Sequence, residues 1–189
     1  STLFPYTTLF RSIPSKDTVY IGEGVDISYY LYFQFPIRRW EIEEFPRVDK
    51  VLKREREIRP QEETVEVGGI LYKRILVHGF KVFPARAGDL SIGQIKLSVS
   101  YASENRFVGL GGERSKTMRN DRIEIKVLPL PVENAPKDFT GLIGAHSFRL
   151  ESYRSKYLVN SPIELKLSVE GPGALENFEA PIIYSHSNL

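Results

Sequence analysis

The three histidines are the first candidates for chemistry, because imidazole can bind a metal ion or move a proton near neutral pH. They are His78, His146 and His186. None has a second metal ligand two or four positions further along the chain. Cysteine is absent, which excludes thiolate metal sites, disulfides and a cysteine nucleophile. We interpret His78 as a packing residue of a strand, with Tyr72, Leu76 and Phe80 on its face.

Adjacent carboxylates occur twice, at Glu43 and Glu44 and at Glu62 and Glu63. Neighbouring residues of a strand point to opposite faces, so neither pair is expected to work as an acid and base couple. Ser147 follows a histidine, but the sequence shows no third member of a catalytic triad. We therefore predict no catalytic residue, no metal site and no bound cofactor.

The run GLGGERSKT, Gly109 to Thr117, has some likeness to a phosphate-binding loop. That motif needs glycine directly before its lysine and a helix after it. Ser115 stands before the lysine here, and no helical pattern follows. The run is predicted to be a loop.

The strongest local charge bias lies in Arg47–Arg59, where nine of thirteen residues are charged, six of them basic. Such a run is either a solvated surface or a docking surface for an acidic partner. If it docks a partner, Lys53, Arg54 and Arg56 are the candidate residues. The segment is predicted to be a solvated connection with a short helix or an edge strand.

The elements around these residues are predicted to be strands. In Val25–Phe33 the odd-numbered residues are apolar and the even-numbered ones are mainly polar, which is typical of a half-buried strand. A second strand is centred on Trp40 and Ile42, and Trp40 is expected in the core. Gly68 and Gly69 separate two β-rich runs and indicate a hairpin.

Later parts of the chain continue the strand pattern. Alternation resumes with Ile95, Leu97, Val99 and Tyr101, and a closing strand contains Ile123, Ile125 and Val127. Residues 102–122 between them are glycine-rich and polar, and are predicted to be a long loop. Strand-like patterns with almost no helix predict an all-β chain of β-sandwich type.

Three prolines between residues 129 and 138 mark a linker, since proline cannot continue a strand ladder. We expect an immunoglobulin-like sandwich over residues 13–128 and part of a second over 139–189. The second unit is too short for a complete sandwich. The predicted fold is therefore tandem immunoglobulin-like β-sandwiches, the second truncated.

The opening stretch, Ser1–Ser12, has an unusual origin in our interpretation. Back-translated in one frame, all twelve residues match a common adapter of DNA-sequencing libraries. Such segments are set aside in fold reasoning. We expect it to be non-native, to pack poorly and to make few ladder bonds, and we expect the natural N-terminus to lie upstream.

Four blocks of the chain together resemble the BatD family, the Bacteroides-aerotolerance or oxygen-tolerance proteins. They are VYIGEGVDISYYLYF (19–33), GGILYKRILVHGFKVFPARAGDLSIGQIKLSV (68–99), IKVLPLPVENAPKDFTGLIGAHSFRLE (125–151) and SPIELKLSVEGPGALENFEAP (161–181). They follow the family's order. One departure is Ala174, which stands where the family usually has asparagine.

The resemblance implies an extracytoplasmic envelope protein of bacteria with immunoglobulin-like domains and a membrane anchor outside this stretch. It implies partners with von Willebrand factor A domains and with tetratricopeptide repeats, and no catalytic residues. We therefore expect a non-enzymatic scaffold in the periplasm that binds neither cofactor nor nucleic acid. The alternative is a carbohydrate- or ligand-binding sandwich, for which Tyr30 and Tyr32 are the one clear aromatic pair.

Overall fold

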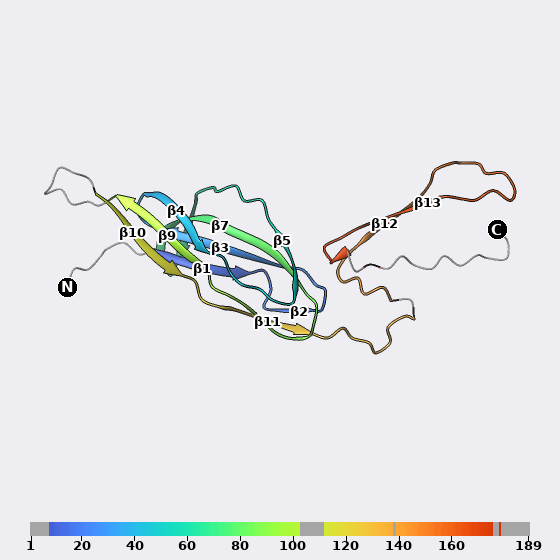
Figure 1. Cartoon of the computed structure of the whole chain (residues 1–189), viewed down its shortest axis with the longest axis horizontal. Helices are drawn as coiled ribbons and strands as arrows, with labels where there is room; N and C mark the ends of the chain where they lie inside the picture. Colours follow the sequence, from blue (N-terminus) through green and yellow to red (C-terminus); the bar gives the residue numbers. More distant parts are fainter. Residues whose placement is uncertain (1–7, 103–111, 138, 176–177, 179–189) are drawn as a thin grey trace.

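The computed structural model describes residues 8–102, 112–137, 139–175 and 178 of the chain. Its regular elements in this part are β-strands, with no α-helix, so the predicted all-β class is confirmed. Most strands form a two-layered sandwich, and two later strands form a separate ribbon (Figure 1).

The first layer is a five-stranded sheet built around one long strand. Its order is β1 (Leu9–Pro14), β3 (Val25–Phe33), β7 (Ile70–Pro84) and β5 (Val51–Glu55). A further strand, β6 (Glu63–Val67), pairs with the other end of β7. Neighbouring strands in this sheet are antiparallel. Because β7 pairs along its length with three strands, it sets the register of the whole layer.

The second layer consists of two three-stranded sheets. The first has the order β10 (Glu113–Arg119), β9 (Lys96–Ala102) and β4 (Ile37–Glu44). The second has the order β2 (Thr18–Tyr20), β11 (Ile123–Leu128) and β8 (Gly88–Ile92). The β2–β11 pair is parallel, unlike the others in this layer.

The strand order corresponds to that of constant-type immunoglobulin sandwiches. There, strands A, B, E and D form one sheet, and C, F and G form the other. Here β1, β3, β7 and β5 take the A, B, E and D places, and β4, β9 and β10 take those of C, F and G. Whether this sandwich is an immunoglobulin-like domain, and whether a second one follows it in tandem, stays a prediction, as do the domain boundaries.

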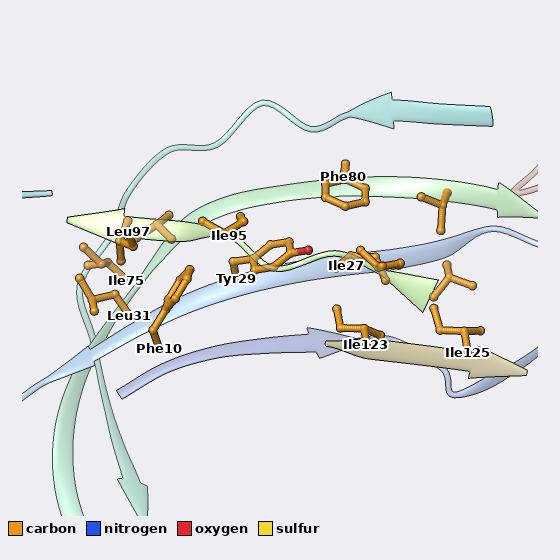
Figure 2. Packing of buried hydrophobic residues seen from close by; sticks show 14 of the residues in the cluster. Phe10, Ile27, Tyr29, Leu31, Ile75, Phe80, Ile95, Leu97, Ile123 and Ile125 are labelled. Carbon is orange, nitrogen blue, oxygen red and sulfur yellow. The ribbon is translucent and has the colours of Figure 1, made fainter. Parts of the chain in front are cut away.

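The core lies between the two layers, and the alternation of inward- and outward-facing residues in β3 supplies part of it. Ile27, Tyr29 and Leu31 are fully buried, and they meet side chains of the facing layer such as Leu97 and Ile125 (Figure 2). Each buried aliphatic or aromatic side chain of this kind stabilises the fold by about 1.5–3 kcal/mol relative to exposure. The predicted inward face of Val25–Phe33 is confirmed. Trp40 packs on the margin of this core and is only partly buried.

The hairpin predicted at Gly68 and Gly69 is confirmed, and it joins β6 to β7. Both glycines have positive φ, 60° and 79°. A two-residue turn with two positive φ angles matches the right-handed twist of the strands, and glycine adopts it without steric cost.

Two expectations for the sandwich are wrong. Residues 102–122 are not one long loop, because Glu113–Arg119 form β10 and pair with β9 in continuous register; residues 103–111 lie outside the described part. The opening segment does not pack poorly where it is described. Leu9–Ser12 belong to β1, which pairs with β3, and Phe10 is buried in the core. The adapter origin of these residues stays a prediction.

The second unit has one ribbon, β12 (Ser147–Ser152) paired antiparallel with β13 (Leu165–Glu170). Phe148 and Leu150 are 59% and 61% exposed, so this unit lacks a closed core among its described residues. Residues 129–137 form no strand, and their role as a linker stays a prediction.

Candidate interaction site

The residues predicted to dock a partner lie on the edge strand β5 or directly after it. Lys53 and Arg54 are within β5, opposite Val82 and Lys81 of β7. Directly opposed residues of two strands point to the same face. Val82 is fully buried, so Lys53 lies on the core side of the sheet and Arg54 on the outer side. The predicted set is therefore divided between two faces.

Lys53 caps the open edge of the core. Its Nζ atom lies 2.6 Å from Oε1 of Glu55 and 4.4 Å from the centre of the buried Phe80 ring. The ammonium group is thus engaged by an anion and by the face of an aromatic ring. Lys53 contributes more to closing the sandwich than to a docking surface.

On the outer face, Arg56 and Lys81 contact Asp26, and Arg54 stands on the same face. Lys81 Nζ lies 3.4 Å from Asp26 Oδ2, and Arg56 Nη1 lies 4.0 Å from Asp26 Oδ1. Arg54 is opposite Lys81 in the strand register. We call Arg54, Arg56 and Lys81 the basic cluster. Sequence reasoning missed Lys81 and Asp26, which only the pairing of β3 with β7 brings to β5.

Local packing holds the two arginines in place. Gly79 leaves the middle of the outer face without a side chain, and an added Cβ there would lie 3.2 Å from the Ile27 carbonyl oxygen and 3.7 Å from Arg56 Nη1. Arg56 fills this space, donates a backbone N–H bond to the Gly79 carbonyl and a side-chain bond to Ser28 Oγ at 3.2 Å. The Arg54 guanidinium lies 4.9 Å from the centre of the Phe83 ring.

The electrostatics of the cluster favour an anion. Two cations, Arg56 and Lys81, contact the one carboxylate of Asp26, and the side chains of Arg56, Lys81 and Asp26 are 39%, 31% and 36% exposed. Ion pairs this exposed contribute between zero and about 1 kcal/mol each. The two ion pairs to Asp26 are therefore weakly held.

The tyrosines of the alternative hypothesis also lie on this outer face. Tyr30 and Tyr32 have ring centres 6.3 Å apart, but their planes differ by 57°. Tyr32 is buried, and the Arg74 guanidinium lies 4.6 Å from the centre of the Tyr30 ring. A flat, open stacking platform for a sugar is not formed, because the rings are tilted and a guanidinium covers one of them.

His78 packs at the core edge with Phe80 on its face, as expected, but Leu76 and Tyr72, which were expected on that face too, lie on the other one. The register of β3 and β7 shifts between Tyr29 and Tyr30, so β7 has an extra residue there. The bulge puts the His78 ring 5.9 Å from Tyr29 and 5.5 Å from Phe80, while Leu76 lies opposite the outward-facing Tyr30. Burial lowers the pKa of His78, with the Glu55 carboxylate opposing the shift.

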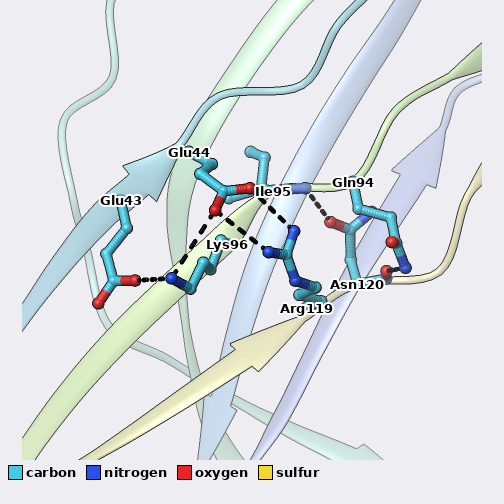
Figure 3. A network of polar contacts seen from close by, with 7 residues as sticks. All are labelled: Glu43, Glu44, Gln94, Ile95, Lys96, Arg119 and Asn120. Atoms are coloured by element: carbon cyan, nitrogen blue, oxygen red, sulfur yellow. Dashed lines mark hydrogen bonds and ion pairs between the residues drawn. The ribbon is translucent and has the colours of Figure 1, made fainter.

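The neighbouring carboxylates of β4 also depart from expectation. A register shift lies between Ile42 and Glu44, and both carboxylates reach one lysine. Lys96 Nζ lies 2.7 Å from Glu43 and 3.7 Å from Glu44, and Arg119 forms two bonds to Glu44 (Figure 3). The group is a ladder of ion pairs across three strands, not an acid and base couple.

The same region holds a buried polar anchor. Asn120 is 1% exposed, and its Oδ1 atom accepts a bond from the Ile95 backbone N–H at 2.6 Å (Figure 3). Its Nδ2 atom donates to the Asp121 carbonyl at 2.6 Å and to Ser12 Oγ at 3.1 Å. These bonds fix the β10–β11 turn against β9 and β1.

The remaining candidates from the sequence do not assemble into a catalytic site in the described part of the chain. Lys116 of the supposed phosphate loop lies in strand β10. His146 Nδ1 lies 3.0 Å from the Gly144 carbonyl oxygen, and His186 lies outside the described residues. No cluster of three or more metal-ligating side chains occurs among the residues described.

Comparison with known proteins adds no identity to these observations. No protein-family model matches the chain, and no curated protein matches it. Within the described ranges we find no apolar helix of a length that would span a lipid bilayer.

Proposed function

We propose that this chain is a non-enzymatic protein-interaction module that docks an acidic partner surface through the basic cluster. One observation carries the proposal: Arg56 and Lys81 both lie beside the single carboxylate of Asp26, and Arg54 lies opposite Lys81 on the same outer face of the sheet. Arginine is well suited to this role, because its planar guanidinium can bind a carboxylate through two parallel hydrogen bonds.

The setting we propose is the bacterial envelope. The four sequence blocks resemble BatD proteins, so the module would be a periplasmic part of a BatD-like aerotolerance system, anchored by a segment elsewhere in the full protein. Its partners would be membrane proteins with von Willebrand factor A domains and tetratricopeptide-repeat proteins. No cofactor takes part. The support is the resemblance of the blocks and the immunoglobulin-type strand order.

A carbohydrate- or ligand-binding module is the second candidate. Three tyrosines on the outer face favour it, with Tyr32 and Tyr72 rings 6.4 Å apart. Tyr32 and Tyr72 are buried, at 4% and 5% exposed, so their faces are closed to a sugar. The protein-docking proposal therefore fits the outer face better.

The test is association kinetics with a von Willebrand factor A domain of the same system, at two salt concentrations. Replacing Arg54 and Arg56 by glutamate should slow association about tenfold or more at low salt, because steering by opposite charges raises on-rates by that order. The difference should shrink near 1 M salt, where the screening length is about 3 Å.

Two control variants separate the basic cluster from general charge. Lys53→Glu tests the residue that faces the core edge, and Arg114→Glu with Lys116→Glu reverses the same charge on the edge strand β10. Neither should slow association as much as the change in the basic cluster. Equal rates for wild type and the Arg54/Arg56 variant at both salt concentrations would disprove the docking site.

A further inference from the structure

The β12–β13 ribbon meets the sandwich at the ribbon's open end. Ser147 of β12 pairs with Glu170 of β13, so the chain segments directly before and after the ribbon lie together at that end. Figure 1 shows the ribbon beyond the end of the sandwich that carries β2. Three segments come together there, and we call them the joint segments: residues 21–24 between β2 and β3, residues 142–146 before β12, and residues 171–173 after β13.

Two contacts connect the sandwich to the second unit, and each lies at a glycine. A Cβ atom added to Gly22 would lie 3.9 Å from Cδ1 of Ile143, and one added to Gly24 would lie 3.2 Å from the carbonyl oxygen of Pro172. The distance at Gly24 is shorter than an ordinary van der Waals contact. Because glycine has no side chain, the turn of the sandwich can approach the second unit this closely.

The two joint segments of the second unit are packed equally tightly against each other. A Cβ atom added to Gly144 would lie 2.9 Å from Cγ of Pro172, and one added to Gly171 would lie 2.0 Å from Cδ2 of His146. The imidazole also lies against Gly173, and its Nδ1 atom is 3.0 Å from the Gly144 carbonyl oxygen. Because each segment fills the space that a side chain would need on the other, the two segments must move together.

The sandwich holds its own joint segment in place. Gly22 donates its N–H to the Pro84 carbonyl at 2.8 Å, at the end of β7, and Ile21 donates to the Leu128 carbonyl at 3.0 Å, at the end of β11. The segment is thus bonded to both layers of the sandwich. Residues 21–24 are all half-buried, although they form a turn at the end of the fold. The contacts at Gly22 and Gly24 therefore connect the ribbon to a fixed part of the sandwich.

We propose that the joint segments hold the ribbon at one fixed orientation to the sandwich. Two units connected by a linker move relative to each other by default, unless contacts between them prevent it. The proline-rich residues 129–138 would permit that movement, and the contacts at Gly22 and Gly24 prevent it. The inference goes beyond the proposed docking function, since it concerns how the chain arranges its own two units.

The joint is small, so its rigidity comes from the fit of the segments and not from a large buried area. Interfaces between domains normally bury about 600–1,500 Å². In the joint, Pro172 lies between Gly24 of the sandwich and Gly144 of the second unit, and neither glycine has room for a methyl group. Packing at this density has low compressibility and transmits strain, so a rotation of the ribbon would force atoms of the segments to overlap.

The joint also places the second unit beside the basic cluster. A Cβ atom added to Gly24 would lie 3.1 Å from Cδ of Lys81 as well as 3.2 Å from the Pro172 carbonyl oxygen. Lys81 and the segment 171–173 therefore border on the same glycine. A partner that binds the basic cluster would meet the second unit at a constant position.

The experiment measures one distance between the two units in the whole chain. The chain contains no cysteine, so spin labels can be attached to two introduced cysteines, Lys126→Cys in β11 and Lys166→Cys in β13. Both lysines are exposed. Pulsed dipolar electron spin resonance then gives the distribution of distances between the labels. We expect one narrow peak, whereas free movement on ten flexible residues would spread the distance by on the order of 15–20 Å.

Ile143→Asp tests the contact with the sandwich, because it replaces an apolar contact at Gly22 by a carboxylate. The distribution should broaden about twofold or more, toward the width that the linker permits. Leu158→Asp is the matched control, since it makes the same kind of change at a residue of the second unit that is 84% exposed, and it should leave the peak unchanged. If circular dichroism shows that Ile143→Asp does not fold, Ile143→Ala replaces it and should still broaden the peak.

Gly171→Ala tests the packing of the two segments of the second unit, because the added methyl group overlaps the His146 ring. It should broaden the distribution. His146→Ala in the same chain removes the ring and should narrow the distribution again. Coupling of this kind between two substitutions is typical of residues in contact.

The other outcomes overturn defined parts of the inference. A broad distribution in the labelled chain without further substitutions would refute the joint. A peak that stays narrow in both Ile143→Asp and Gly171→Ala would show that these segments do not hold the ribbon. Broadening by Gly171→Ala that His146→Ala does not relieve would refute the packing of His146 on Gly171 as its cause.

Discussion

Replacing Phe10 by alanine tests whether the opening segment belongs to the fold. Phe10 is 8% exposed, lies in β1 and packs with its ring centre 6.3 Å from that of Tyr29. The same residue falls within the twelve that match a sequencing adapter. The structure and the inferred origin therefore make opposite predictions for one substitution.

The expected loss follows from the position of Phe10. Removing a buried phenylalanine side chain costs about 3–5 kcal/mol, because apolar transfer energy is lost and a cavity remains. Phe10 lies in the outermost strand of its sheet, where neighbours can collapse inward. We therefore expect about 3 kcal/mol, at the lower end of this range.

Urea unfolding measures this loss through the midpoint, provided the slope with denaturant is unchanged. Leu9→Ala is the matched control, because Leu9 lies in the same strand but is only half-buried, and it should cost less than half as much. A Phe10→Ala midpoint equal to that of wild type would show that β1 does not contribute to the fold in solution. The opening segment would then be incidental to the fold.

Three further outcomes are expected. Asn120→Ala should cost about 2–3 kcal/mol in urea unfolding, since it leaves the buried Ile95 N–H without its acceptor, whereas Asn120→Asp should retain that bond. Burial lowers the pKa of His78, so the unfolded chain binds a proton at this residue more tightly than the folded chain does. The folded state should therefore lose stability as the pH falls from about 6.5 through the lowered pKa, and the loss should be smaller in His78→Gln. Limited proteolysis should cut within residues 129–138 and leave a protected sandwich, and uniform cutting would contradict the linker.

Much of the sandwich could be predicted because its buried strands alternate regularly. In β3 every second residue enters the core, and the pattern of apolar residues is sufficient to predict both the strand and its inner face. Strand β10 could not be predicted in this way. Nearly every residue of its sequence ERSKTMR is exposed. Because neither face of this strand is buried, the sequence shows no alternation of apolar and polar residues.

The positions of residues that depend on how strands pair also could not be predicted from the sequence. The bulge beside Tyr29 moves His78 to the face opposite Leu76, although simple alternation groups the two. The basic cluster needs the register of β5 against β7 and of β7 against β3, which places Arg54, Lys81 and Asp26 together. A charge count could find Arg54 and Arg56, but only the pairing assigns Lys53 to the other face.

The parallel pairing of β2 with β11 has a consequence for how the chain folds during synthesis. Thr18 near the beginning of the sandwich lies opposite Lys126 near its end, so the second layer cannot close until nearly the whole unit has left the ribosome. At about 5–20 residues per second, the early strands wait several seconds with apolar faces uncovered. Contacts this distant in sequence also slow folding itself. We therefore expect recovery of soluble protein to depend on chaperones and on translation speed.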